Sequence, residues 1–99
     1  MSIETIELTK DDVKIQEPSL YNVVFLNDNV TTVQFVEVVL MKYFGKTKSE
    51  ATEIIDRINN EDRAIAGVYY EDIAETKAEL VRNAAKHCNY PFRVVVEEV

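Results

Sequence analysis

The feature that most constrains the fold of this chain is a short apolar run followed by a polar corner, which is the group of three polar residues between a predicted strand and a predicted helix. Tyr21–Leu26 is predicted to be a strand, because five of its six residues are apolar or aromatic. Such a composition is typical of a strand buried on both faces. Asn27, Asp28 and Asn29 follow it, and a pattern with helical spacing begins soon after. Asn and Asp are common in ordinary turns, so the corner by itself leaves a structural and a binding interpretation open.

The rest of the chain predicts the order β-α-α-β-α-β and an α+β fold. Capping-box patterns at Thr31–Gln34 and Thr47–Glu50 indicate the starts of two helices. Gly45 is expected to end the first helix in a left-handed conformation. The further predictions are a strand at residues 63–70 with a bulge or close approach at its Gly67, a helix at 72–88 capped by Asp72, and a strand at 92–96.

Each predicted helix carries an apolar stripe that we expect to face the core. The stripes consist of Val36, Val39, Leu40 and Tyr43, widened by Phe35, Val38 and Met41, in the first helix; Ala51, Ile54, Ile55 and Ile58 in the second; and Ile73, Leu80, Val81 and Ala84 in the third. Residues 1–18 are expected to form a flexible extension, and residues 19–99 a single domain.

Charge and composition exclude several classes of function. A net charge of −7 argues against nucleic acid and against anionic membrane surfaces, both of which attract basic proteins. The lone Cys88 gives no internal disulfide, and no apolar run is long enough to span a bilayer. The first residues lack a signal-peptide pattern. We therefore expect a cytoplasmic protein.

Catalytic chemistry is not evident in the sequence. His87 is the single histidine, and its place late in a helix suits a positive charge at a helix C-terminus. Cys88 has no second cysteine for a metal site and is expected to be a small, partly buried residue. Two glycines do not make a phosphate-binding loop. The sequence thus predicts a protein that is not an enzyme, with no cofactor and no metal.

Separate blocks of sequence together resemble one known family. The blocks are Tyr21-x-Val23-x-x-x-Asn27-Asp28 followed by Thr31, Ala64-Ile65-Ala66-Gly67-Val68-Tyr69, and Ala74-Glu75-Thr76-Lys77, with Pro91 before the last strand. In this spacing and element order the chain resembles ClpS, the bacterial adaptor of the N-degron pathway, over about residues 18–99.

The resemblance implies three helices packed on a three-stranded antiparallel sheet. It also implies a function. ClpS proteins bind the free N-terminus of proteins that begin with Leu, Phe, Tyr or Trp, and deliver them to the N-terminal domain of the unfoldase ClpA or ClpC for degradation by ClpP. The family's N-terminal extension takes part in the hand-over, which would give residues 1–18 a role.

The resemblance also implies roles for individual residues. The substrate α-amine would be bound by Asn27, Asp28, Asn29 and Asn59; the hydrophobic pocket would be formed by Thr31, Val33, Val36, Ile55, Ile58 and Phe92; and the unfoldase would be contacted by Glu75, Thr76 and Lys77. Recognition of a terminal amine by converging polar groups is a known binding mode.

At three of these positions the chain departs from the family pattern. Asn29 replaces a second Asp, Asn59 replaces a His, and Val33 replaces a frequent Met. Asn keeps a carbonyl acceptor but removes the carboxylate charge. An alternative therefore stays open, in which the chain docks on the unfoldase as a regulator without reading hydrophobic N-termini. A third possibility, by fold analogy alone, is a factor-recruiting domain like that of the ribosomal stalk protein.

Overall fold

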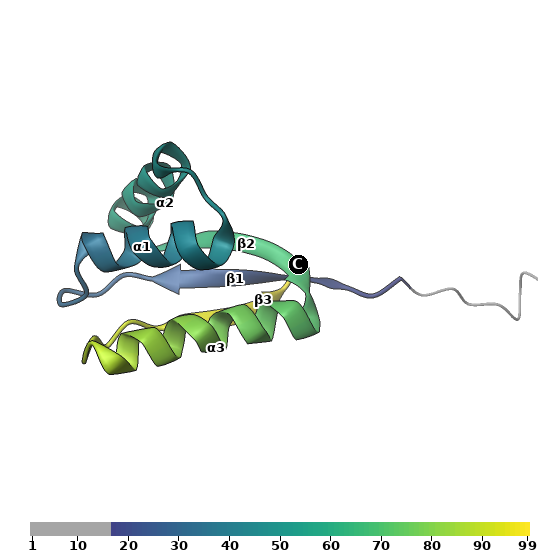
Figure 1. Cartoon of the computed structure of the whole chain (residues 1–99). Helices are drawn as coiled ribbons and strands as arrows, with labels where there is room; N and C mark the ends of the chain where they lie inside the picture. The colour runs from purple at the N-terminus through teal and green to yellow at the C-terminus, as the bar shows by residue number, and fades with distance from the viewer. Residues whose placement is uncertain (1–16) are drawn as a thin grey trace, which may run out of the picture.

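The computed structural model describes residues 17–99, so the predicted extension at residues 1–18 lies almost wholly outside the described part. The described chain follows the order β-α-α-β-α-β (Figure 1). Its elements are β1 (Leu20–Leu26), α1 (Val33–Phe44), α2 (Lys48–Glu61), β2 (Arg63–Tyr70), α3 (Glu71–His87) and β3 (Val94–Glu98). The predicted element order and α+β class are confirmed.

The strands form an antiparallel sheet in the order β2-β1-β3. The apolar strand β1 lies in the centre, and Val23, Val24 and Phe25 have no exposed surface. Along β2, Ala64 is buried and Ile65 is exposed. This alternation means that one face of the sheet meets the helices while the other is open at β2.

A bulge interrupts β2 at the predicted position. Val23 pairs with Gly67 and Val24 pairs with Ile65, so Ala66 is the extra residue. A Cβ atom on Gly67 would lie 2.5 Å from the hydroxyl oxygen of Tyr69. The glycine therefore allows the bulged strand to pass close to this ring.

The helix ends agree with their sequence signals, except at the starts of α1 and α3. Gly45 is left-handed (φ 64°), and Thr47 and Glu50 form the predicted capping box of α2. The N-cap of α1 is Thr32 instead of the predicted Thr31: its side chain accepts a hydrogen bond from the N–H of Phe35, 3.2 Å away. The predicted cap Asp72 lies inside α3, whose N-cap position is Tyr70.

Aromatic rings join the centre of the sheet to the layer of helices. The ring of Phe25 packs edge-on against Phe44 at the end of α1 and against Phe92, at centroid distances of 5.4 and 5.0 Å. Phe92 was predicted to lie in the last strand, but β3 begins at Val94. Phe92 is buried in the segment before β3, and this position brings it beside both α1 and the end of β1.

The apolar stripe predicted for α3 is partly wrong. Val81 is buried as expected, but Ile73 and Leu80 are 45% and 42% exposed and Ala84 is half-buried. The buried side of α3 is instead made by Ala74, Ala78, Val81 and Ala85. Small residues let a helix approach the sheet closely. This close packing favours burial of the alanines over burial of the larger Ile and Leu side chains. Val38 and Met41 on α1, and Cys88, are likewise exposed where burial was expected.

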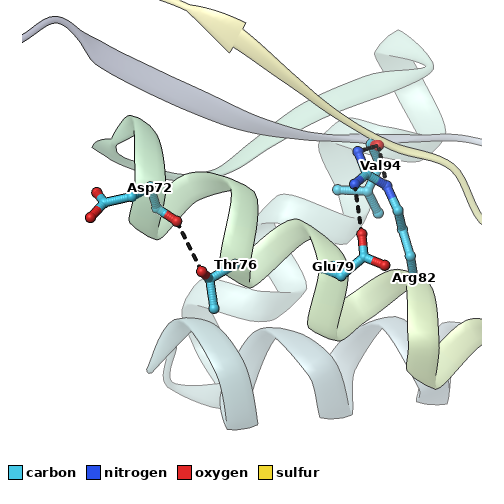
Figure 2. Close-up of polar contacts among 5 residues, drawn as sticks. All are labelled: Asp72, Thr76, Glu79, Arg82 and Val94. Atoms are coloured by element: carbon cyan, nitrogen blue, oxygen red, sulfur yellow. Dashed lines mark hydrogen bonds and ion pairs between the residues drawn. The ribbon is translucent and has the colours of Figure 1, made fainter.

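An arginine ties α3 to the last strand. Figure 2 shows the Arg82 guanidinium donating hydrogen bonds from Nε and Nη2 to the carbonyl oxygen of Val94, at 3.2 and 2.7 Å. Nη1 also pairs with the carboxylate of Glu79 at 3.3 Å. Hydrogen bonds from a charged donor are stronger than neutral ones, so this contact helps to hold the first residue of β3 beside α3. None of the described helices is long and apolar enough to cross a membrane.

Candidate functional site

A pocket of about 60 Å³ opens where β1 ends, beside the start of α1 and the end of α2. It is lined by Asn27, Asp28, Thr31, Val33, Val36, Ile55, Ile58, Asn59 and Phe92. These are nine of the ten residues to which the resemblance assigned the amine site and the hydrophobic pocket. The tenth, Asn29, is exposed in the turn and does not line the pocket.

The apolar walls come from three directions. Val36 on α1, Ile55 and Ile58 on α2, and Phe92 before β3 are all buried. Ile55 and Ile58 share one side of α2, because residues three apart are neighbours on a helix surface. Val33 is 54% exposed and lies at the mouth. The pocket thus has buried apolar walls and one exposed apolar side chain at its rim.

The carboxylate of Asp28 is held within the corner by its own loop. Its Oδ1 accepts hydrogen bonds from the N–H groups of Val30 and Thr31, at 2.8 and 2.7 Å, and its Oδ2 accepts one from the hydroxyl of Thr31, at 2.8 Å. This engagement explains why Thr31 does not cap α1. A carboxylate has about four acceptor sites, so three donors leave room for one more.

The same contacts control the charge of Asp28. Partial burial alone would raise its pKa, but the hydrogen bonds from Thr31 and Val30, with the nearby positive charge of Arg93, lower the pKa below the ordinary value overall. Hydrogen bonds to the charged form stabilise that form. The corner therefore presents a fixed negative charge at neutral pH.

Asn27 is anchored to the end of α2. Its backbone N–H donates to the carbonyl oxygen of Asp62 at 2.9 Å, and its side-chain Nδ2 lies 3.4 Å from the Asp62 carboxylate. Asn59 reaches the same pocket from the last turn of α2. Asp62 was not among the predicted site residues. Its only signal in the sequence is its place in the polar run of residues 59–62, at the end of this helix.

The three residues of the predicted docking block do not share one environment. Glu75 and Thr76 are exposed, and the Thr76 hydroxyl donates to the carbonyl oxygen of Asp72 at 2.9 Å (Figure 2). Lys77 is half-buried, and its ammonium donates to the carbonyl oxygen of Tyr43 at 2.6 Å. Consecutive helical residues point about 100° apart, which accounts for the difference.

Acidic, histidine and cysteine side chains are spread out in residues 17–99, where no group of three or more is placed to hold a metal ion. The pocket itself offers amide and carboxylate oxygens beside an apolar cavity. Together, the fold and this pocket define a small binding domain for a ligand that is both polar and apolar.

Comparison with known proteins gives this domain its family. The family model described as ATP-dependent Clp protease adaptor protein ClpS matches residues 16–95, and the chain belongs to this family. Proteins called ATP-dependent Clp protease adapter protein ClpS are 41% identical in Herminiimonas arsenicoxydans, over 93% of this chain and 90% of the relative, and 43% identical in Helicobacter hepaticus, over 92% of each.

A solved structure is also similar. Agrobacterium tumefaciens ClpS2 bound to L-phenylalaninamide aligns with a TM-score of 0.81 and 31% identity, over 84% of this chain and all of the other. The predicted family and fold are confirmed by these matches. An adaptor family is not an enzyme family, so that prediction is confirmed as well. The predicted partnership with the Clp protease system is confirmed at the level of the family.

Proposed function

We propose that this chain is a cytoplasmic adaptor that binds proteins beginning with Leu, Phe, Tyr or Trp and delivers them to a Clp AAA+ unfoldase for degradation. The observation that carries the proposal is a pocket that combines amide and carboxylate oxygens with buried apolar walls. An N-terminal residue with a large apolar side chain needs both halves of such a site. The phenylalaninamide bound to Agrobacterium tumefaciens ClpS2 has the same two parts, a free amine and a benzyl group.

The polar half of the pocket suits an α-ammonium group. This group has a full positive charge and three N–H donors, so it requires several acceptors in fixed positions. Asn27, Asp28 and Asn59 line the pocket and supply a carboxylate and two amide oxygens. Asn29 lies outside the lining, and we assign it at most an indirect effect on the bound amine.

The apolar half suits one hydrophobic side chain, which supplies on the order of 2–3 kcal/mol when buried. The cavity of about 60 Å³ is smaller than the cavity of roughly 150 Å³ that holds a benzene ring in an engineered protein. An aromatic residue therefore has to widen the pocket, and Val33 at its rim is the apolar lining residue least confined by packing, since it is the most exposed of them. Leu requires less widening than Trp.

The delivery step requires a second surface. We assign docking on the N-terminal domain of ClpA or ClpC to the start of α3, with Glu75 and Thr76 as the exposed contacts. Lys77 contributes there only through the part of its side chain that remains accessible. Residues 1–18 are proposed to take part in the hand-over.

Titration with short peptides tests the proposal. Peptides that differ only in the first residue, Phe, Leu or Gly, are titrated against the full chain by fluorescence anisotropy. We expect micromolar or tighter binding for Phe and Leu, and at least tenfold weaker binding for Gly, because Gly fills none of the apolar cavity. Equal affinity for all three, together with retained binding to the unfoldase N-terminal domain, would favour the alternative of a docking regulator.

A further inference from the structure

Asp62 adopts an unusual backbone conformation beside the proposed amine site. It ends α2 with φ 67° and ψ −3°, in the left-handed region that disfavours residues with a Cβ atom. Its N–H donates to the carbonyl oxygen of Ile58 at 2.8 Å, and its own carbonyl oxygen accepts the N–H of Asn27. Glycine would satisfy both backbone contacts with less strain. The aspartate side chain therefore needs a separate explanation.

The side chain of Asp62 faces the side chain of Asn27. An Asn amide has a donor end and an acceptor end, and only the Nδ2 end can face a carboxylate without repulsion. The Nδ2 to Oδ1 distance of 3.4 Å is long, so the contact selects an orientation more than it adds binding energy. Because the amide is planar, its Oδ1 must then point away from Asp62.

We propose that Asp62 is a positioning residue, which holds the Asn27 amide with its oxygen free to accept a hydrogen bond from the substrate α-ammonium. The inference rests on the proposed function, since it concerns the same pocket. Asn27 lines that pocket and Asp62 does not, so Asp62 acts through Asn27. The backbone hydrogen bond between these residues already fixes the Asn27 main chain. The Asp62 carboxylate then controls only the rotation of the Asn27 side chain.

Three variants separate this role from an effect on the fold. Asp62→Gly relieves the backbone strain and removes the acceptor. Asp62→Asn keeps an acceptor oxygen and tolerates the left-handed conformation, but has no charge. Asn89→Gly is the matched control, because Asn89 is also left-handed (φ 59°) and does not line the pocket. Each is titrated with a Phe-initiated peptide, and its stability is measured by urea unfolding.

We expect Asp62→Gly to be as stable as the parent chain or more stable, yet to bind the peptide about fivefold more weakly. Asp62→Asn is expected to stay within about twofold of the parent affinity, and Asn89→Gly to bind like the parent. In NMR spectra, the side-chain NH₂ signals of Asn27 should shift in Asp62→Gly and not in Asn89→Gly.

Two results would overturn the inference while leaving the proposed function intact. One is unchanged peptide affinity in Asp62→Gly. The other is an equal loss in Asp62→Asn and Asp62→Gly, which would show that the charge matters and the orientation does not. If the parent chain binds no Phe-initiated peptide at all, the proposed function fails and this inference fails with it.

Discussion

The ammonium group of Lys77 on α3 donates a hydrogen bond of 2.6 Å to the backbone carbonyl of Tyr43, in the last turn of α1. Carbonyl groups in the last turn of a helix lack intrahelical partners, and a positive charge is favourable there. The same ammonium lies 5.7 and 5.2 Å from the ring centroids of Phe44 and Tyr69. Lys77 therefore links two helices inside the domain, in addition to any role in docking.

Replacing Lys77 is expected to destabilise the fold. Lys77→Glu removes the donor and places a negative charge at the end of α1, which should lower the free energy of unfolding by about 1–3 kcal/mol. Thr76→Ala, at the exposed neighbouring position, is expected to change it by less than about 0.5 kcal/mol. Urea denaturation of both variants measures the difference. Equal stability of Lys77→Glu and the parent would show that the contact with Tyr43 contributes nothing.

Docking is better tested at Glu75, because this side chain is exposed and has no such structural contact with α1. Glu75→Lys should weaken association with the unfoldase N-terminal domain at least tenfold, and leave peptide affinity within about twofold. Glu53→Lys is the control, since Glu53 is an exposed glutamate on α2, outside the block. Calorimetric titration measures the association. A similar loss in both variants would show that overall charge, and not this position, governs docking.

Val33 is expected to control which side chains enter the pocket. It is an exposed lining residue at the pocket mouth, where a longer Met would narrow the opening. A methylene-sized difference in an apolar pocket is worth about 1–3 kcal/mol. Val33→Met should therefore raise the preference for Leu-initiated over Ile-initiated peptides. If the ratio of the two affinities is the same in both proteins, Val33 is not the gate.

Acidification should remove the contribution of Asp28 to the free energy of unfolding. Its pKa in the folded chain is below the ordinary value of 3.8. The stabilisation is therefore fully present above that value, and is lost as the pH falls through the lower, folded pKa. In Asp28→Asn this part of the acid dependence should be absent. Urea unfolding from about pH 6 down to about pH 2 measures it; parallel curves for both proteins would contradict the assignment.

The sequence was most informative where spacing and capping act locally. The capping box of Thr47 and Glu50, the left-handed Gly45 and the bulge next to Gly67 were all predicted, because each depends on a few neighbouring residues. The buried side of α3 was not predicted correctly, because a stripe of alanines and a stripe of larger apolar residues have the same helical period. Only packing against the sheet decides that Ala74 and Ala78 are buried while Leu80 is exposed.

The pocket lining was predicted through the family resemblance and not through residue patterns alone. Residues on α1, on α2 and before β3 meet there only after the chain has folded, so no local signal joins Val36 to Phe92. The contact between Asn27 and Asp62 was missed for the same reason, since it joins residues that are 35 positions apart. Lys77 was assigned to the surface because nothing near it in the sequence indicates the carbonyl of Tyr43.

The central claim is that the corner at Asn27 and Asp28 binds a free N-terminal amine. Two peptides test this claim most directly. A Phe-initiated peptide and its N-acetylated twin have the same side chain, and acetylation removes the charge and two donors. Titration of the chain with each should show that acetylation weakens binding at least tenfold, about 1.4 kcal/mol. Equal binding of the two peptides would contradict the assignment of this corner.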